Sequence, residues 1–212
     1  MTKLITAQEK FWTSEFGRDY AQRNYRSSKE LDAFYMENLG IPRSKINKDF
    51  LGKLKIGNIL EVGCNAGNQL SMLQNQGFKN LYGIEIYDQA MELAKQTTKN
   101  LSIIQGSGFD MPFKNSCFDL VFTSGVLIHT NPKHLKKLMA EIYRTSKKYI
   151  WGVEYYHPKH ISIDYRGNKN CLWKGDFAQM YLDFFSDLKL VKEKKYRYLK
   201  NDNMDSSFLL KK

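Results

Sequence analysis

The chain has few cysteines and prolines and no long apolar run. Its 212 residues include four prolines and three cysteines, which are Cys64, Cys117 and Cys171. An odd number of cysteines without metal-ligand spacing argues against a disulfide framework and is typical of a reducing compartment. No apolar stretch approaches the roughly 20 residues that cross a bilayer, and residues 1–6 lack the apolar core of a signal peptide. We therefore expect a cytoplasmic protein with no membrane partner.

Composition indicates an ordinary globular protein with a basic surface. Hydrophobic residues make up 42% and aromatic residues 14% of a chain long enough for one domain with a full core. The formal net charge is +11. Such a charge favours anionic partners, although lysines spread over solvated helix faces would give the same total. The charge therefore allows an acidic ligand without requiring one, and the sequence leaves the oligomeric state open.

From about residue 56, short apolar runs alternate with helical patterns, which is typical of βαβ units and a parallel sheet. Asn131 and Pro132 predict the start of one helix, and an aromatic stripe over 177–185 predicts a second that packs into the core. We expect a Rossmann-like α/β fold with a seven-stranded, mostly parallel sheet and a C-terminal antiparallel hairpin. Residues 1–45 are expected to form an N-terminal helical cap, and residues 46–212 the main domain. The predicted strands are 58–62, 80–86, 101–104, 119–122, 149–154, 188–199 and 204–210.

A glycine-containing turn follows the first predicted strand. Ligands of open α/β sheets bind beyond the carboxyl ends of the strands, and Gly63 and Gly67 would let the backbone approach such a ligand. A dinucleotide motif of the form G-x-G-x-x-G would place its middle glycine where Asn65 stands. Glu85, 24 positions after Glu61, is placed to accept hydrogen bonds from ribose hydroxyls, with Ile86 beside it. The pattern favours a nucleoside cofactor without a pyrophosphate.

Glu61 narrows the choice of cofactor. It lies in an otherwise apolar strand, where an uncompensated carboxylate costs several kcal/mol. S-adenosylmethionine carries both a sulfonium and an ammonium group and could supply the compensation. The alternatives are that Glu61 caps backbone amides of the next turn and that Glu85 is an ordinary acid at a strand end.

Two later segments, 105–113 and 116–122, resemble the third and fourth motifs of class I S-adenosylmethionine-dependent methyltransferases. The resemblance implies an acidic residue against the adenine amino group, and Ser107 occupies that position. Ser107 and the backbone at Gly108 are therefore expected to replace it. Phe109 is a candidate to flank the adenine ring or to belong to the core. The expected fold is thus that of a class I methyltransferase.

The chain also resembles a narrower family, the methyltransferases associated with pseudaminic acid biosynthesis. The resemblance extends from about residue 11 to the end of the chain. It implies methylation of an oxygen or nitrogen of a small acidic sugar of the nonulosonic or pseudaminic acid type, or of its nucleotide-activated form. The segments that carry it are 11–24, 60–68, 122–129, 141–144, 154–156, 165–167 and 176–177.

Methyl transfer requires the acceptor to be held in line and, for some nucleophiles, a proton to be removed. His129 is a candidate general base because its ordinary pKa suits neutral pH, or it orders the following loop. Glu154 and Tyr156 are further catalytic candidates, and Ser124 a cofactor contact. Tyr155 and His157 are candidate acceptor contacts. His157 and His160 lack acidic or cysteine partners, so we expect no metal.

The remaining candidates lie near the two ends of the predicted site. Tyr165 and Arg166 are candidate substrate contacts, because a guanidinium binds a carboxylate or phosphate in bidentate fashion, but Arg166 could equally form a structural salt bridge. In the leader, Trp12 and Arg23 are predicted cofactor contacts within a lid that includes Phe16 and Tyr20. These aromatic residues could instead simply pack on the sheet.

Two other functions remain open. The first is methylation of RNA or of another small molecule, although Thr123-Ser124-Gly125-Val126 stands where enzymes acting on base amino groups carry Asp/Asn-Pro-Pro-Tyr. Nucleic acid is therefore a disfavoured partner. The second is a non-catalytic module that binds S-adenosylmethionine and regulates a partner.

Overall fold

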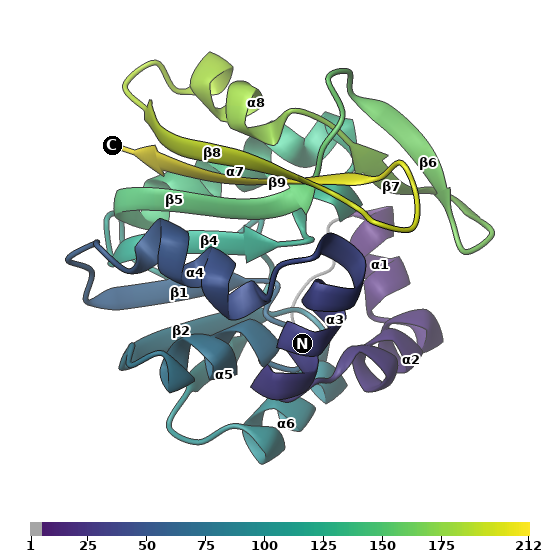
Figure 1. Ribbon diagram of the computed structural model, residues 1–212, viewed down its shortest axis with the longest axis horizontal. Coiled ribbons are helices and arrows are strands. Elements are labelled where there is room, and N and C mark those ends of the chain that lie inside the picture. The colour runs from purple at the N-terminus through teal and green to yellow at the C-terminus, as the bar shows by residue number, and fades with distance from the viewer. Residues whose placement is uncertain (1–5) are drawn as a thin grey trace.

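One seven-stranded sheet organises the molecule (Figure 1). The computed structural model describes residues 6–212, apart from the side chain of Thr97. The strand order is β3-β2-β1-β4-β5-β9-β8, in which the first five strands are parallel and the last two antiparallel to their neighbours. The predicted mostly parallel sheet with a C-terminal antiparallel hairpin is confirmed. The strands are β1 (Asn58–Val62), β2 (Asn80–Glu85), β3 (Ser102–Gln105), β4 (Phe118–Ser124), β5 (Ser146–Tyr155), β8 (Lys189–Arg197) and β9 (Met204–Lys211).

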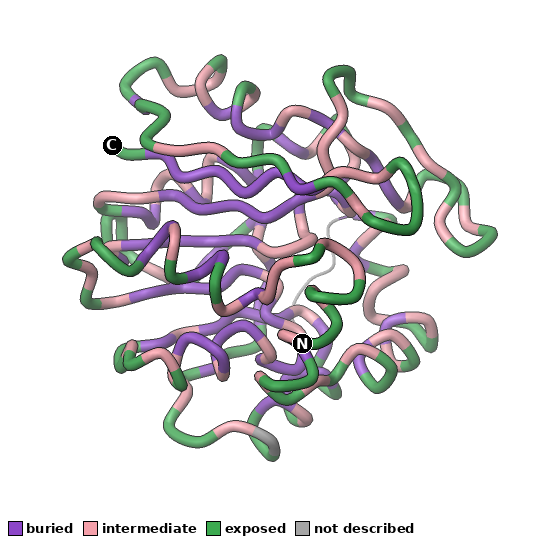
Figure 2. Tube along the Cα trace, viewed as in Figure 1, coloured by how far each residue is buried: buried purple, intermediate pink, exposed green. Residues whose placement is uncertain are grey.

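Helices cover both faces of the sheet and create two apolar cores. Ile46 of α4 and Leu70 of α5 pack in one core, whereas Leu135 of α7 and Phe177 of α8 pack in the other. Strand residues alternate between the two, so the central strands are buried along most of their length (Figure 2). The aromatic stripe at 177–185 is core, as predicted. The helices are α4 (Arg43–Leu51), α5 (Asn68–Asn75), α6 (Asp88–Thr97), α7 (Pro132–Thr145) and α8 (Phe177–Phe184).

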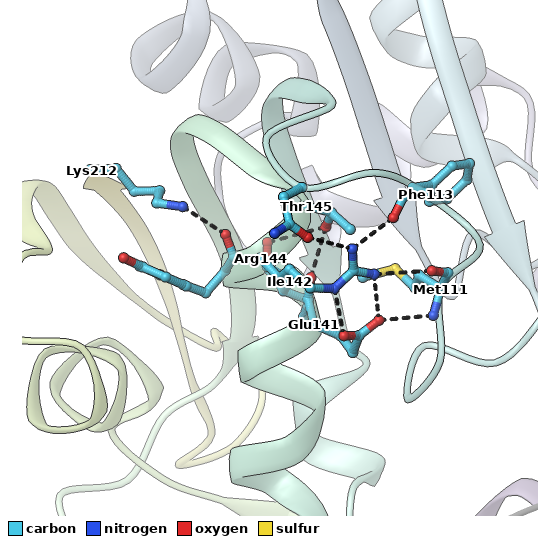
Figure 3. Close-up of polar contacts among 9 residues, drawn as sticks. Met111, Phe113, Glu141, Ile142, Arg144, Thr145 and Lys212 are labelled. Carbon is cyan, nitrogen blue, oxygen red and sulfur yellow. Dashed lines mark hydrogen bonds and ion pairs between the residues drawn. The ribbon is translucent and has the colours of Figure 1, made fainter.

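Helix α7 begins as predicted and holds the loop after β3 through its last turn. Asn131 caps the helix by accepting a hydrogen bond from the Lys133 amide at 3.0 Å. At the other end, Arg144 and Glu141 form an ion pair at 2.7 Å. Figure 3 shows the pair against the loop, where Arg144 donates to the carbonyl oxygens of Met111 and Phe113 and Glu141 accepts from the Met111 amide. This network fixes the loop that connects β3 to β4.

Three helices precede α4, namely α1 (Ala7–Trp12), α2 (Glu15–Asn24) and α3 (Ser28–Leu39). In Figure 1, α1 and α2 lie to the right, on the side toward which the arrow of β4 points. These helices therefore cover the carboxyl ends of the parallel strands. The predicted boundary between residues 45 and 46 falls inside α4, which packs on the sheet. Residues 1–5 of the predicted cap lie outside the described part of the chain.

A small separate hairpin, which the sequence analysis did not identify as strands, follows β5. Strands β6 (Ile161–Tyr165) and β7 (Asn168–Lys174) pair antiparallel. Their turn consists of Arg166 and Gly167, with φ angles of 49° and 80°, which is the combination that a tight type I′ hairpin turn requires. The hairpin brings Tyr165 and Arg166 back toward the carboxyl ends of the sheet.

Candidate functional site

Two adjoining cavities, of about 170 and 410 Å3, open at the carboxyl ends of the strands. The first, here called the inner cavity, extends over the ends of β1, β2 and β3 and under α1. The second, the outer cavity, lies between the end of β1, helix α3 and the β6–β7 hairpin. Both cavities are lined by Gly63, Asn65, Ser124 and His129. A ligand bound in one would therefore face a ligand bound in the other across this shared wall.

The predicted turn after β1 brings bare backbone to both cavities. Gly63 has a φ of 69°, and a Cβ there would lie 2.7 Å from Val126 Cγ2, so a side chain is excluded. Asn65 tolerates a φ of 47°. Gly67, in contrast, lies outside both cavity walls, and a Cβ there would meet Thr98 at 3.3 Å. The structure thus does not bring Gly67 to the cavity walls, because the residue instead permits close packing of α5 and α6, and its cofactor contact stays a prediction.

Glu85 forms part of the inner cavity wall together with Ile86. The carboxylate accepts hydrogen bonds from the Asn65 amide at 2.8 Å and the Tyr87 amide at 2.9 Å. The side chain is 8% exposed, and burial raises the pKa of its carboxyl group while the two amides lower it. A carboxylate held in place by amides is a preorganised acceptor for hydroxyl donors, and the ribose contact of Glu85 stays a prediction.

Glu61 lines the outer cavity beside the turn and is 3% exposed. Burial raises the pKa of its carboxyl group well above the ordinary value, and Arg43 and the Leu70 amide lower it. Its Oε2 atom has no hydrogen-bond partner among residues 6–212. Buried polar atoms are rarely left unpaired, so this oxygen fits a cationic ligand group. The contact with the Leu70 amide shows that Glu61 also caps a backbone amide after the turn, which is the alternative role given above.

The loop after β3 and helix α1 close the far end of the inner cavity. Gly108 and Phe109 line the cavity, whereas Ser107 is buried behind it. Ser107 donates a hydrogen bond to Glu9 Oε1 at 2.5 Å, and Glu9 lines the cavity. The structure therefore places Ser107 behind the cavity wall, and its own cofactor contact stays a prediction. The sequence analysis missed Glu9, because nothing local links residue 9 to residue 107.

The leader forms a lid, but not with all of the predicted residues. Trp12 lines the inner cavity, and its ring lies 5.0 Å from Tyr20 and 4.6 Å from His129. Arg23 is exposed and lies outside both cavity walls, because α2 buries the face that carries Gly17 and Ala21. The structure thus does not bring Arg23 together with the other predicted cofactor contacts. Arg26 lines the outer cavity instead.

His129 lies on the shared wall, where its Nδ1 is 2.7 Å from the Cys171 carbonyl oxygen. A carbonyl only accepts, so Nδ1 carries the hydrogen and the lone pair is on Nε2. Burial lowers the pKa of His129 to about 4, partly opposed by the Cys171 carbonyl. The side chain is therefore neutral at pH 7. Its expected titration near neutrality is wrong, because burial against aromatic rings disfavours the imidazolium.

Two buried carboxylates in the outer cavity do titrate near neutrality. Burial raises the pKa of Glu154 to about 7, although its carboxylate accepts hydrogen bonds from the amides of Val126 and Ile128 at 3.2 and 3.4 Å. Burial also raises the pKa of Asp205 to about 7, and this residue is 6% exposed. Asp205 Oδ1 has no hydrogen-bond partner within the described chain. No local pattern points to Asp205, which comes from the last strand.

Ser124 is held in the shared wall by a buried cation. Arg43, which is fully buried, donates through Nη1 to Ser124 Oγ at 3.1 Å and to the Tyr35 hydroxyl at 2.7 Å. Its guanidinium lies 5.2 Å from the Trp151 ring. Arg43 thus orients two polar groups of the outer cavity, since Tyr35 lines it as well.

The remaining acceptor-side candidates divide into two groups. Tyr155, Tyr165 and Arg166 line the outer cavity, and their contacts with an acceptor stay predictions. Tyr156 and His157 lie outside both cavity walls, so the structure does not bring them together with the other candidates. The chain leaves β5 after Tyr155, so that the Tyr156 amide donates to the Met204 carbonyl at 2.7 Å and its ring lies 3.8 Å from Lys195 Nζ. The His157 ring bonds the carbonyl of Lys159 nearby at 2.8 Å.

No group of three or more His, Cys, Asp or Glu side chains among residues 6–212 could hold a metal ion. Among the described helices, none has the length and apolar character needed to span a bilayer.

Comparisons with known proteins agree with this geometry. Residues 60–149 match the family model described as "Methyltransferase domain". An uncharacterized methyltransferase of Staphylococcus carnosus is 35% identical over 77 residues, which are 36% of this chain and 36% of that protein. The chain spans only 32–42% of the length of the curated relatives that it matches.

Solved structures show the same fold over most of the chain. The PH0226 protein of Pyrococcus horikoshii superposes with a TM-score of 0.70 at 15% identity, over 93% of this chain and 98% of that chain. The 1,6-didemethyltoxoflavin-N1-methyltransferase of Burkholderia thailandensis, solved with S-adenosylhomocysteine, gives 0.70 at 14% identity, over 100% and 93%. Residues 60–149 are therefore similar to a methyltransferase domain, and the chain has a Rossmann-like fold that it shares with these solved structures.

Proposed function

We propose that the protein is an S-adenosylmethionine-dependent methyltransferase. The observation that carries this proposal is the pair of cavities that share a wall at Gly63, Ser124 and His129. When bound, S-adenosylmethionine supplies an electrophilic methyl group. Glu85 would hold the ribose, and the unpaired Oε2 of Glu61 would meet the ammonium group. Burial of the Glu61 carboxylate costs stability without a ligand, and the ammonium group would offset this cost.

For the acceptor, we propose an oxygen or nitrogen of a small acidic sugar, of the nonulosonic or pseudaminic acid type or its nucleotide-activated form. Arg26 and Arg166 line the outer cavity and could pair with a carboxylate or phosphate. The tyrosine hydroxyls of the cavity suit the hydroxyls of a sugar. Arg166 lies at the tip of the hairpin, where its φ of 49° is the one that the type I′ turn requires.

The chain's own groups could also accept the proton that a hydroxyl or ammonium acceptor loses. Glu154 and Asp205, each with a pKa raised to about 7 by burial, are poised between the two protonation states at neutral pH. His129, with a pKa of about 4, is a weaker base but offers a neutral Nε2 lone pair on the shared wall. We assign His129 to orienting the acceptor, and the carboxylates to receiving the proton.

Mass spectrometry with methyl-labelled S-adenosylmethionine tests the proposal. Purified protein is incubated with a panel of nonulosonic acids, their nucleotide conjugates, neutral sugars, amines and RNA. We expect label on an acidic sugar or its conjugate, reduced by Arg166→Ala but unchanged by Lys159→Ala, an exposed cation outside the cavities. Label on RNA alone or on amines alone would overturn the sugar assignment. Binding of cofactor without any transfer would favour a regulatory module.

A further inference from the structure

The adenine end of the proposed cofactor site lies at the ends of β2 and β3. These two strands are neighbours in the sheet, so Glu85 at the end of one and Gly106 after the other line the same cavity. The apolar side chains of Ile86, Phe109 and Leu138 line this cavity as well. A flat heteroaromatic ring is the ligand part that fits an apolar slot beside a ribose-binding carboxylate.

A second carboxylate in this cavity wall comes from the leader rather than from the sheet. Glu9 lines the inner cavity, is 7% exposed, and accepts a hydrogen bond from Ser107 Oγ through Oε1 at 2.5 Å. Its Oε2 accepts from the Thr6 amide at 2.8 Å, while the Glu9 amide donates to Thr6 Oγ1 at 3.1 Å. This reciprocal capping box fixes the first turn of α1. Glu9 is therefore held rigidly at the cavity wall.

We propose that Glu9 accepts a hydrogen bond from the exocyclic amino group of adenine, so that helix α1 is part of the cofactor site. The inference rests on the proposed function, because it assumes an adenosyl ligand in the inner cavity. A carboxylate accepts hydrogen bonds and repels other acceptors. It would thus select adenine, which carries an amino donor at this edge, over hypoxanthine, which carries a carbonyl oxygen there. Ser107 acts as a positioning residue that orients the carboxylate.

Isothermal titration calorimetry with two ligands tests this assignment. S-adenosylhomocysteine and S-inosylhomocysteine differ at the position that Glu9 would read. We expect the unmodified protein to prefer the adenosyl ligand by at least about tenfold, the range of a charge-assisted hydrogen bond. Glu9→Gln should reduce that preference to about threefold or less, because the amide can rotate to donate to the carbonyl. Glutamine also keeps the capping box, so α1 should stay folded.

Two controls separate the outcomes. Glu15→Gln replaces an exposed carboxylate at the start of α2 and should leave both affinities unchanged. Ser107→Ala should weaken the preference less than Glu9→Gln does. If Glu9→Gln weakens both ligands equally, or changes neither, Glu9 does not read the base and the inference fails. If the unmodified protein binds neither ligand, the proposed function itself fails.

Discussion

Asp205 should make the protein less stable as the pH rises. Its carboxyl group has an ordinary pKa of 3.8, and burial raises the pKa to about 7 in the folded state. Below pH 3.8 the group is protonated in both the folded and the unfolded chain and costs nothing. Above it, the unfolded chain ionises first, so folding is progressively disfavoured until the pH passes the folded-state pKa. Stability is therefore present at low pH and is lost as the pH rises through about 7.

The size of this effect follows from the two pKa values. A difference of about three units corresponds to about 4 kcal/mol at full ionisation, at about 1.4 kcal/mol per unit. At pH 5 less than half of this free energy has been lost. The free energy of unfolding should therefore fall by about 3 kcal/mol between pH 5 and pH 8. Asp205→Asn keeps the size of the side chain and removes the ionisation. The free energy of unfolding of the variant, relative to the unmodified protein, should therefore increase by about 3 kcal/mol over this range.

Urea denaturation followed by tryptophan fluorescence at pH 5, 6, 7 and 8 measures this difference. Asp202→Asn is the matched control, because it removes an exposed carboxylate from the turn between β8 and β9. The free energy of unfolding of this control should differ from that of the unmodified protein by the same amount at every pH. If the difference in free energy of unfolding between Asp205→Asn and the unmodified protein also stays constant, within about 0.5 kcal/mol, Asp205 is not protonated in the folded protein near neutrality. Its assignment as a proton acceptor would then be wrong.

Three further predictions concern the shared wall and the turn. Gly63→Ala should lower the free energy of unfolding by about 1–3 kcal/mol in thermal denaturation, because of its φ of 69° and the contact with Val126; an unchanged stability would contradict this geometry. An NMR titration of His129 should show a midpoint near pH 4, and a midpoint near 6.5 would refute the burial argument. Glu61→Gln should stabilise the protein at pH 8 yet weaken S-adenosylhomocysteine binding at least about tenfold; unchanged affinity would remove Glu61 from the site.

Features that depend on neighbouring residues were predictable from the sequence. The strand of β1, the turn at Gly63 and the capped start of α7 each depend on a few consecutive residues with strong backbone preferences. Glu85 was found because the spacing from one strand end to the next is set by a single βα unit. The β6–β7 hairpin was missed although Ile161 to Tyr165 alternates and Arg166-Gly167 is a turn signal.

Features that depend on packing between distant segments were not predictable. Glu9 meets Ser107 across 98 positions, and Asp205 reaches the outer cavity because β9 inserts beside β5. Arg43 in α4 is fully buried, with its guanidinium against the Trp151 ring. A local pattern would instead assign this charged residue to the surface. The pKa of His129 likewise depends on the rings that the leader brings over it.

Direct binding of the cofactor tests the central claim. S-adenosylmethionine and S-adenosylhomocysteine are titrated by calorimetry into the unmodified protein, into Glu85→Ala, and into Glu92→Ala, which removes an exposed carboxylate of α6. We predict saturable binding at one site, weakened at least about 30-fold by Glu85→Ala through the loss of charge-assisted hydrogen bonds, and unaffected by Glu92→Ala. Absence of binding, or full affinity in Glu85→Ala, would contradict the account.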